Sequence, residues 1–497
     1  MRENSPIISE AHRHSVETRI ATRVLLGALL IGGLGALFYA RHDLTLSHYD
    51  ARAHLLVARR ILDSLTPGWR QIGAVWLPLP HLVAMLPVQW DWAYRTGYPI
   101  VVISIAILAA GLAGLSAYLY KLTGSRWAAA IAPALILLNP NVLYLQSTPM
   151  TEALLIGFML LALLSVHAWT VDATPARTHR AGLLLAALMW TRYEGWCVAI
   201  GLILIATWSR LRARASLPWG LAGYACAAVT LFMLLSWTST GHWFVSSGFF
   251  VPDNPALHRP LVAFAQVVRA LTDLGSPAVL IIAAVGLGLI VWQLLQGQWS
   301  PAPLPLALVA AAALPWFAFF SGHPLRVRYM VPLIPATAVL SAIAIARIGG
   351  RWQPLGAMLL VGLACIERPP LDLTAPMVQE AQWETPFRLK REEVTRQFLP
   401  IYDDTPILAS MGSLGHYMQE SSHAGLALKN FLHEGNGDLW QAALQFPRRH
   451  VRWILMEERA EGGDMLAALS RSRPDFLQGF SRTAEGGGLV LYRRDDR

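Results

Sequence analysis

Residues 21–40 read ATRVLLGALLIGGLGALFYA, an apolar stretch long enough to cross a bilayer as a single helix. A membrane-spanning helix needs about 20 consecutive, mostly apolar residues. The polar lead before this stretch is too long for a cleavable signal peptide, and no small-residue cleavage pattern follows it. The stretch therefore predicts the first span of an integral membrane protein.

The composition of the whole chain agrees with this prediction. The 497 residues are 55% hydrophobic and 14% charged, with a net charge of +9 and a mean hydropathy of +0.43. Soluble globular proteins carry about 25% charged residues, so the composition argues against a cytosolic enzyme and excludes collagen, coiled-coil and disordered proteins. Three cysteines are too few for a disulfide scaffold, and we expect all of them to be core thiols: Cys197, Cys226 and Cys365.

Ten further apolar runs follow, so the sequence predicts about eleven transmembrane helices. These runs begin near Tyr98, Trp127, Met150, Ala181, Gly195, Leu217, Pro277, Ala302, Tyr329 and Pro354. Residues 181–208 are too many for one span and few for two. We therefore expect two abbreviated helices there, whose tip at residues 191–195 points outward.

Basic residues indicate which loops face the cytoplasm, because Lys and Arg concentrate in short cytoplasmic loops. The leader and the loops assigned to that side carry Arg2, Arg13, Arg19, Arg23, Lys121, Arg126, Arg177, Arg180, Arg210, Arg212, Arg214, Arg347 and Arg351. The N-terminus is then cytoplasmic, and an odd number of spans leaves the C-terminal part outside. We expect a bacterial-type inner or plasma membrane, with outer loops near 41–97, 240–276 and 322–328.

Charge divides the chain into two bodies. Residues 1–367 hold 24 Lys and Arg against 13 Asp and Glu, whereas residues 368–497 hold 16 against 18. We expect a leader over 1–20, an all-α polytopic membrane domain over 21–367 that includes the first outer loop, and a soluble extracytoplasmic α/β domain over 368–497. This last domain either recognises an acceptor or only caps the membrane part.

Within the soluble domain, three short segments have the pattern of β-strands. They are residues 405–410, 451–456 and 488–492, with helical patterns between them.

The segment after the first span carries the strongest candidate for chemistry. Asp50 opens a pattern with apolar residues at 55, 58, 61, 62 and 65, which predicts a helix lying flat on the membrane surface. His54 follows Asp50 by four residues and shares its side of that helix. An Asp at a helix start is more often an N-cap than a catalytic group, so both interpretations of Asp50 stay open.

Other candidates lie near the ends of spans. Glu152 and Glu194 stand at span ends or within apolar sequence, where ionisable side chains usually face a protein-lined cavity. An ion pair of Glu194 with Arg192 that only fixes a helix tip explains them equally well. Trp76 precedes the proline-rich approach to the second span, and membrane anchoring is a commoner role for such an indole than sugar binding.

Two outer arginines, Arg326 and Arg328, do not fit the pattern of cytoplasmic basic loops. A planar guanidinium can hold two oxygens of a lipid phosphate. We expect Arg328 first to bind such a phosphate, followed by Arg326, Arg192 and Arg59. Ordinary contact with lipid headgroups remains an equal alternative.

Motifs of several enzyme classes are missing from the sequence. It contains no P-loop, no Rossmann glycine pattern in context, no H-E-x-x-H and no G-x-S-x-G. This argues against an ATPase, a dehydrogenase, a zinc peptidase of that type and a typical hydrolase.

Taken together, these features resemble polytopic glycosyltransferases of the GT-C superfamily, near the protein O-mannosyltransferase and aminoarabinose-transferase branch. The resemblance covers most of residues 20–350. It rests on Asp50, His54 in an aromatic position, Pro78 and Pro80, the pair Thr151 and Glu152, and Arg328 and Tyr329 followed by Pro332 and Pro335.

The resemblance implies transfer of a sugar from a polyprenyl-phosphate donor to an acceptor on the outer face, with Asp50 as the base. Relatives often carry a second acid where this chain has Ala51, so we expect no metal and no cofactor. A phosphate leaves without protonation, so one carboxylate suffices for a single, inverting displacement. The residues expected to bind substrate are His54, Trp76, Glu152, Tyr193, Glu194 and Tyr329.

The identity of the acceptor stays open between a glycan, a lipid and a protein, and we expect neither nucleic acid nor nucleotide sugar. A transporter or flippase of a lipid-linked substrate is the alternative class, but it should show charges deep in several spans. The long first outer loop favours the enzyme. A structural membrane subunit would not need Asp50, Glu152, Glu194 and Arg328 to converge.

Overall fold

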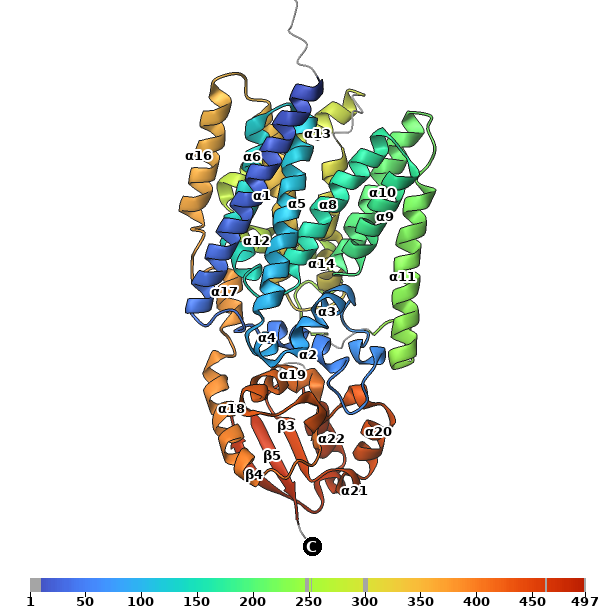
Figure 1. Ribbon diagram of the computed structural model, residues 1–497, viewed down its shortest axis with the longest axis vertical. Helices are drawn as coiled ribbons and strands as arrows, with labels where there is room; N and C mark the ends of the chain where they lie inside the picture. The colour runs from blue at the N-terminus through green and yellow to red at the C-terminus, as the bar shows by residue number, and fades with distance from the viewer. Residues whose placement is uncertain (1–9, 246–249, 252, 298–302, 461–462, 496–497) are drawn as a thin grey trace, which may run out of the picture.

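The computed structural model describes residues 10–245, 250–251, 253–297, 303–460 and 463–495. A bundle of long helices forms one end of the molecule and a small α/β domain forms the other (Figure 1). The chain enters the bundle at the end away from the α/β domain, through α1 (Glu10–Arg41). The first nine residues of the expected leader, which include Arg2, lie outside the described residues.

Seven helices in the described part of the chain are long and apolar enough to cross a bilayer. They are Ser15–Arg41 of α1, α5 (Tyr98–Thr123), α8 (Glu152–Val171), α10 (Glu194–Arg212), α11 (Trp219–Thr240), α13 (Pro277–Leu295) and Val327–Ala346, which joins η4 (Val327–Leu333) to α15 (Ile334–Ala346). These helices support the prediction of an integral membrane protein.

The count of eleven spans is not confirmed, because four of the expected runs form shorter helices. These are α6 (Arg126–Leu137), α9 (Pro175–Met189), the pair η3 (Leu304–Ala312) and α14 (Ala313–Phe320), and α16 (Trp352–Glu367). The 12 residues of α6 extend only about 18 Å, less than the hydrocarbon thickness of about 30 Å. The chain breaks there at Asn139 and continues as α7 (Pro140–Leu145), since proline cannot continue the helical hydrogen bonding.

Residues 181–208 fold back on themselves, as the sequence predicts. Helices α9 and α10 pack against each other and are joined by the turn 190–193. Only α9 is abbreviated, because α10 has 19 residues and is one of the full-length candidates. The tip contacts the first loop, since the Leu79 N–H donates to the Trp190 carbonyl at 3.0 Å.

Close helix packing fixes the two spans that lead into the site. A Cβ on Gly111 of α5 would lie 2.8 Å from the backbone of Gly157 in α8, and a Cβ on Gly286 of α13 would lie 2.0 Å from the Leu340 carbonyl in α15. Small residues allow such close approach of membrane helices. The packing therefore sets the positions of Glu152, at the start of α8, and of the turn η4 before α15.

The first loop, between α1 and α5, forms a layer between the bundle and the α/β domain (Figure 1). It contains α2 (Tyr49–Arg60), η1 (Trp69–Ile72), α3 (Leu79–Ala84), η2 (Pro87–Gln89) and α4 (Asp91–Thr96). The expectation that α2 lies flat on the membrane surface is wrong, because both its faces are covered by protein. Leu55 and Ala58 pack within the loop, whereas Leu56 and Val57 belong to the core of the α/β domain.

The α/β domain contains one five-stranded sheet with the order β2-β1-β3-β5-β4. Its strands are β1 (Ile407–Ala409), β2 (Phe431–Leu432), β3 (Trp453–Glu457), β4 (Phe480–Gly486) and β5 (Leu489–Arg494). Strand β1 pairs in parallel with β2 and β3, and β5 pairs antiparallel with β3 and β4. The three expected strands correspond to β1, β3 and β5. The sequence missed β2, which has two residues, and β4, whose outer positions are polar.

Helices cover the sheet and connect it to the bundle. They are α17 (Pro376–Ala381), α18 (Thr385–Phe398), α19 (Met411–Glu420), α20 (Asp438–Gln445), α21 (Pro447–His450) and α22 (Met465–Ser472). Helix α19 packs directly on α2, and α17 packs on α7 and η4. The α/β domain thus touches the segments that carry Asp50 and Arg328.

The three cysteines are free, as expected, but they do not all lie in the core. Cys226 is exposed on α11, and Cys197 and Cys365 are half-buried.

Candidate active site

Asp50 lies in the first turn of α2 without capping the helix. The N-cap is His48, whose Nδ1 accepts the Asp50 backbone N–H at 3.1 Å. The Asp50 carboxylate instead forms an ion pair with Arg328, and its side chain remains 10% exposed. The interpretation of Asp50 as an N-cap is therefore wrong.

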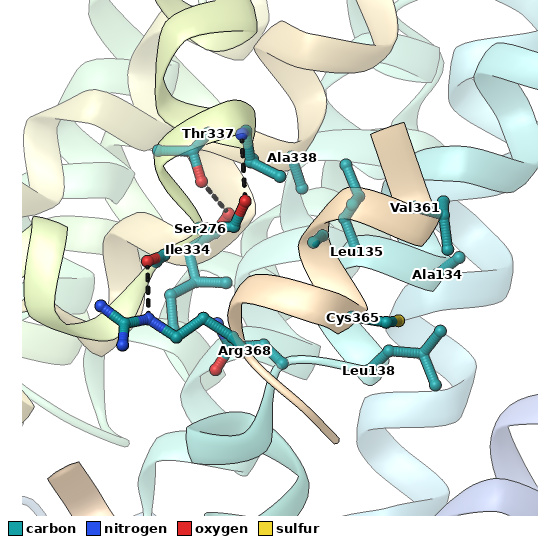
Figure 2. A pocket seen from close by; sticks show the side chains of 14 residues that line it. Ala134, Leu135, Leu138, Ser276, Ile334, Thr337, Ala338, Val361, Cys365 and Arg368 are labelled. Carbon is teal, nitrogen blue, oxygen red and sulfur yellow. Dashed lines mark hydrogen bonds between the residues drawn. The ribbon is translucent and has the colours of Figure 1, made fainter. Parts of the chain in front are cut away.

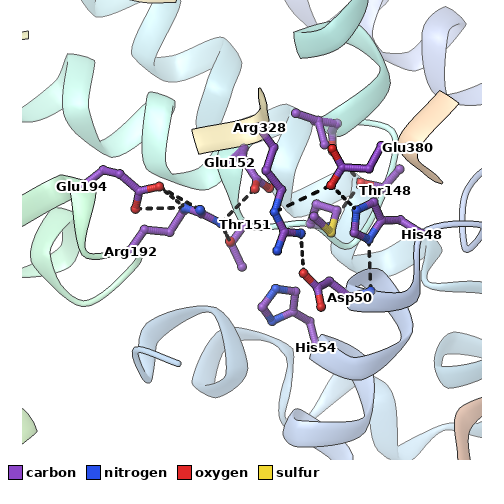
Figure 3. A network of polar contacts seen from close by, with 12 residues as sticks. His48, Asp50, His54, Thr148, Thr151, Glu152, Arg192, Glu194, Arg328 and Glu380 are labelled. Carbon is purple, nitrogen blue, oxygen red and sulfur yellow. Dashed lines mark hydrogen bonds and ion pairs between the residues drawn. The ribbon is translucent and has the colours of Figure 1, made fainter. Parts of the chain in front are cut away.

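Arg328 belongs to η4, the 3-10 turn that opens the last span before α16. Its Nη1 donates to Asp50 Oδ2, and its Nε lies 3.9 Å from Glu380 Oε1. Pro332 and Pro335 lack a backbone N–H, so they favour a tight turn at this point over a regular helix. Figure 3 shows the guanidinium between the two carboxylates.

Glu380 was missed by the sequence analysis, although it is part of this network. It comes from α17, and its Oε1 lies 3.5 Å from His48 Nε2. Because His48 Nδ1 accepts a hydrogen bond, the ring proton sits on Nε2 and faces Glu380. No pattern in the sequence marks it, since Glu380 stands between Gln379 and Gln382 in a segment of mixed polarity.

A second arginine cluster lies at the tip between α9 and α10. Arg192 Nη1 donates to Glu152 Oε1 at 2.8 Å and to Thr151 Oγ1 at 3.1 Å, while its Nη2 donates to Glu194 Oε1 at 2.8 Å. Glu152 is fully buried. The expected ion pair of Arg192 with Glu194 is present. Arg192 also pairs with Glu152, which lies on the side of the Asp50 network (Figure 3).

A short relay of rings fixes the tautomer of His54. His81 Nδ1 lies 3.2 Å from the Leu77 carbonyl, and His81 Nε2 lies 3.1 Å from His54 Nδ1. A carbonyl only accepts, so His81 carries its proton on Nδ1, and His54 Nδ1 must donate to His81. This leaves His54 Nε2 as a hydrogen-bond acceptor, beneath the Trp76 ring at 4.2 Å between centroids.

Electrostatics keeps Asp50 ionised and His54 neutral. Burial alone would raise the pKa of Asp50, but Arg328, and then His48 and His54, outweigh it and lower this pKa to about 2. Burial lowers the pKa of His54 to about 3, against the opposing effect of Asp50. For Glu380, burial is again outweighed, by His48 and Arg328, and its pKa is lowered. While Arg328 holds it, Asp50 is therefore a charged but weak base.

Arg59 is not brought to this network. Its Nε donates to Asp63 at 2.9 Å, its Nη2 donates to Asp91 at 2.6 Å, and its guanidinium lies over the Tyr94 ring. These contacts hold α2 to α4 within the first loop. The expectation that Arg59 binds a phosphate is not supported, because its guanidinium N–H groups bond Asp63 and Asp91.

The remaining expected residues lie around the network. Arg326 precedes η4 and is buried. The Tyr329 hydroxyl lies 3.4 Å from His323 Nε2, and the Tyr193 hydroxyl donates to the Val75 carbonyl at 3.3 Å. Tyr193 is therefore placed beside the loop residue next to Trp76.

A small cavity elsewhere in the bundle is a poor candidate for the site. It has a volume of about 30 Å³ and lies among α6, α13, α15 and α16, with Arg368 at its edge (Figure 2). This is about the room of one water molecule. No carboxylate lines it, and Arg368 donates to the carbonyls of Gly275 and Thr272. It offers neither a base nor space for a sugar.

The residues that could hold a metal ion are also found elsewhere. Among the described residues, the group with suitable spacing is Glu384, His416 and Glu457, all in the α/β domain. Arginines, in contrast, provide the positive charge around Asp50.

Comparison with known proteins identifies the fold. No protein-family model matches the sequence, and a search of curated proteins found no match. Among solved structures, ArnT from Cupriavidus metallidurans in the apo state is similar with a TM-score of 0.54 and 14% identity, covering 93% of this chain and 97% of that one. The same ArnT bound to undecaprenyl phosphate gives 0.52 and 13%, covering 95% and 97%. The chain has the GT-C fold.

The GT-C fold confirms the architecture that the sequence resemblance implies. The likeness extends over the bundle and the α/β domain, because nearly the full length of both chains aligns. The archaeal oligosaccharyltransferase AglB from Archaeoglobus fulgidus, in complex with an inhibitory peptide and a dolichol-phosphate, aligns more distantly. Its TM-score is 0.46 at 13% identity, with 96% of this chain and 74% of that chain covered.

Proposed function

We propose that this protein is a membrane glycosyltransferase that transfers a sugar from a polyprenyl-phosphate donor to an acceptor on the outer face of the membrane. One observation carries the proposal: Asp50 and Arg328, 278 residues apart in the sequence, form an ion pair at the junction of the bundle and the first loop. ArnT, which has the same fold, binds undecaprenyl phosphate. A polyprenyl phosphate is therefore the donor class we assign.

Arg328 is the residue we assign to the donor phosphate, with Arg192 and Arg326 contributing nearby charge. A guanidinium binds phosphate oxygens through two parallel hydrogen bonds. Arg328 Nη1 now donates to Asp50, while its Nε faces Glu380. An incoming phosphate can replace Asp50 at Nη1 and leave the Glu380 side in place. Donor binding then both anchors the phosphate and frees the carboxylate.

The freed carboxylate is the base of the reaction. Once the charge of Arg328 is shared with the phosphate, the pKa of Asp50 rises from its low value, because the Arg328 charge is the largest factor lowering it. Asp50 then takes the proton of the acceptor hydroxyl, whose oxygen attacks the anomeric carbon. The bond from that carbon to the phosphate oxygen breaks, and the phosphate leaves with the electron pair, stabilised by Arg328. A single displacement inverts the anomeric configuration.

His54 and the aromatic residues position the substrates. The relay from Leu77 through His81 leaves His54 Nε2 as an acceptor, four residues from Asp50 on the same helix. A neutral acceptor there can bind a neighbouring hydroxyl of the sugar or the acceptor, while Asp50 takes the proton of the attacking hydroxyl. Trp76 covers the His54 ring and, with Tyr193 and Tyr329, supplies apolar faces for a sugar ring.

Glu152 and Glu194 act through Arg192 in this proposal. Both carboxylates bond its guanidinium, and Glu152 does so from the first turn of α8. They keep a second positive charge beside Arg328 and within reach of the donor phosphate.

The topology belongs to the same proposal. The α/β domain and the first loop lie at one end of the bundle and the start of α1 lies towards the other (Figure 1). With the N-terminus in the cytoplasm, Asp50 and the α/β domain face outward. A glycan, a lipid and a protein are all admissible acceptors.

The test is a reconstitution of the purified full-length chain with a panel of polyprenyl-phosphate sugars. We expect release of free polyprenyl phosphate that depends on both the protein and an acceptor fraction. Movement of the intact donor across the bilayer without that release would instead indicate a transporter.

A further inference from the structure

A second group of ionisable side chains lies within the α/β domain, where three separate elements meet. Glu384 precedes α18, His416 lies in α19, and Glu457 ends β3. One possible ligand atom from each lies within 4.8 Å of the other two. These residues are far apart in the sequence, so the fold itself brings them together.

Two of the three side chains are buried without the partners that burial requires. His416 and Glu457 are each 8% exposed, and His416 Nε2 has no hydrogen-bond partner. Within the described part of the chain, no hydrogen bond or ion pair reaches the Glu457 carboxylate. Its backbone N–H is occupied by Asp464. A buried carboxylate is costly unless a proton or a cation neutralises it.

The neighbouring arginines bond other carboxylates and not that of Glu457. Arg391 donates to Glu384 Oε2 at 2.9 Å and to both oxygens of Glu420 at 2.8 and 3.0 Å, and Arg52 of α2 pairs with the same Glu420. The positive charges of these two arginines are thus paired with the carboxylates of Glu384 and Glu420, and the Glu457 carboxylate has no such partner among the described residues. The second oxygen of Glu384 stays available.

We infer that Glu384, His416 and Glu457 bind one divalent cation of the zinc class. One imidazole nitrogen and two carboxylate oxygens form a three-ligand set that suits Zn²⁺, with water in the fourth position. Calcium and magnesium prefer sets made only of oxygen. The Glu384 side chain is 32% exposed, so the ion has a route from solvent.

The bound ion would join α18, α19 and β3, and thereby support α2. Helix α19 packs on α2, and its last residue, Glu420, bonds Arg52 of α2. The role we assign to the ion is structural. It takes no part in the proposed transfer reaction, so the two proposals can fail separately.

The experiment uses the purified full-length protein, stripped with EDTA and reloaded with Zn²⁺. Elemental analysis after removal of excess metal should give about one zinc per chain. Reloading should raise the melting temperature, and excess Mg²⁺ or Ca²⁺ should neither displace the zinc nor reproduce the rise. A wild-type protein that retains no transition metal and melts unchanged overturns the inference.

Matched variants locate the ion. His416→Gln and Glu457→Gln should each weaken zinc binding by more than about 100-fold, since even changes to residues that only contact a ligand cost 10 to 100-fold. His450→Gln and Glu458→Gln make the same changes at exposed residues of the α/β domain and should keep both the zinc and the rise in melting temperature. Because Glu457→Gln removes the unpaired charge, it should fold at least as well as metal-free wild type. Zinc retained by both ligand variants contradicts the assignment.

Discussion

Helix α2 carries two buried ion-pair networks on different faces, and they differ in how completely their partners are used. Arg52 pairs with Glu420, which also pairs with Arg391, and each of the three guanidinium nitrogens of Arg391 donates to a carboxylate of Glu384 or Glu420. Asp50, two residues earlier, pairs with Arg328. In this second network, Arg328 Nε and Glu380 Oε1 have no hydrogen-bond partner. The Asp50 side chain also stays 10% exposed. The saturated network connects α2 to the α/β domain, whereas the unsaturated one has bonding capacity left, which our proposal assigns to the donor phosphate.

Replacing the carboxylate of the unsaturated network should have the largest effect on the reaction. Asp50→Asn keeps the shape of the side chain but removes the base, so we expect kcat to fall by about 10²- to 10⁴-fold, the range for general-base catalysis. The melting temperature should also fall, because the ion pair with Arg328 is lost, but the folded protein should keep its binding of the donor. Transfer assays on the reconstituted protein and thermal melting measure the two quantities.

The matched change in the saturated network should affect stability instead. Glu420→Gln leaves Arg52 and Arg391 without their shared carboxylate, which should cost about 3–5 kcal/mol of unfolding free energy. The fraction that stays folded should keep its kcat. A loss of kcat as large as that of Asp50→Asn, without a loss of stability, would remove the distinction between the two networks.

Removing the cation of the unsaturated network should weaken use of the donor. Arg328→Ala removes a charge-assisted contact worth about 1.5–3 kcal/mol, so kcat/KM for the donor should fall by about 10- to 100-fold. Arg328→Lys should recover only part of the loss, since an ammonium cannot form the same paired hydrogen bonds. Unchanged donor kinetics in Arg328→Ala would exclude it from phosphate binding.

The pH dependence of stability should report the Asp50 pair without any substrate. The folded pKa of Asp50, about 2, is below the value of about 3.9 for an unfolded chain. Its stabilisation, on the order of 2 kcal/mol, is therefore present above about pH 4 and lost as the pH falls towards 2. The difference in melting temperature between wild type and Asp50→Asn should be constant from about pH 5 to 9 and shrink below about pH 4. A difference that changes most near neutral pH would contradict the pairing.

The smallest effect is expected at Glu380, which acts through Arg328. Glu380→Gln keeps a hydrogen-bonding group but loses the charge, so we expect KM for the donor to rise by less than about tenfold with little change in kcat. Glu380→Asp should restore part of the wild-type KM. A fall in kcat like that of Asp50→Asn would make Glu380 a participant in the chemistry.

Much of the membrane part follows from the sequence, because long apolar runs have few alternatives to crossing a bilayer. The runs at Tyr98 and Pro277 became full-length helices, whereas the run at Trp127 was cut short by the proline after Asn139. Apolar length alone therefore does not show where a proline divides a run into two shorter helices.

The sequence also indicated several members of the candidate site, but not all. Asp50, Arg328, Glu152 and Arg192 were expected, since charges at span ends are costly without partners. Glu380 was missed because its partners, His48 and Arg328, come from distant segments. Periodicity located the apolar face of α2 but could not reveal that the α/β domain covers its other side, since this cover begins more than 300 residues later.

The exchange of Arg328 from Asp50 to the donor phosphate is the central claim, and binding and turnover measured on one preparation of Asp50→Asn test it most directly. The account predicts that this variant binds undecaprenyl phosphate at least as tightly as wild type, because Arg328 is already free, while it releases free carrier from a sugar-loaded donor at least about 100-fold more slowly. Weaker carrier binding together with release at a near wild-type rate would contradict it.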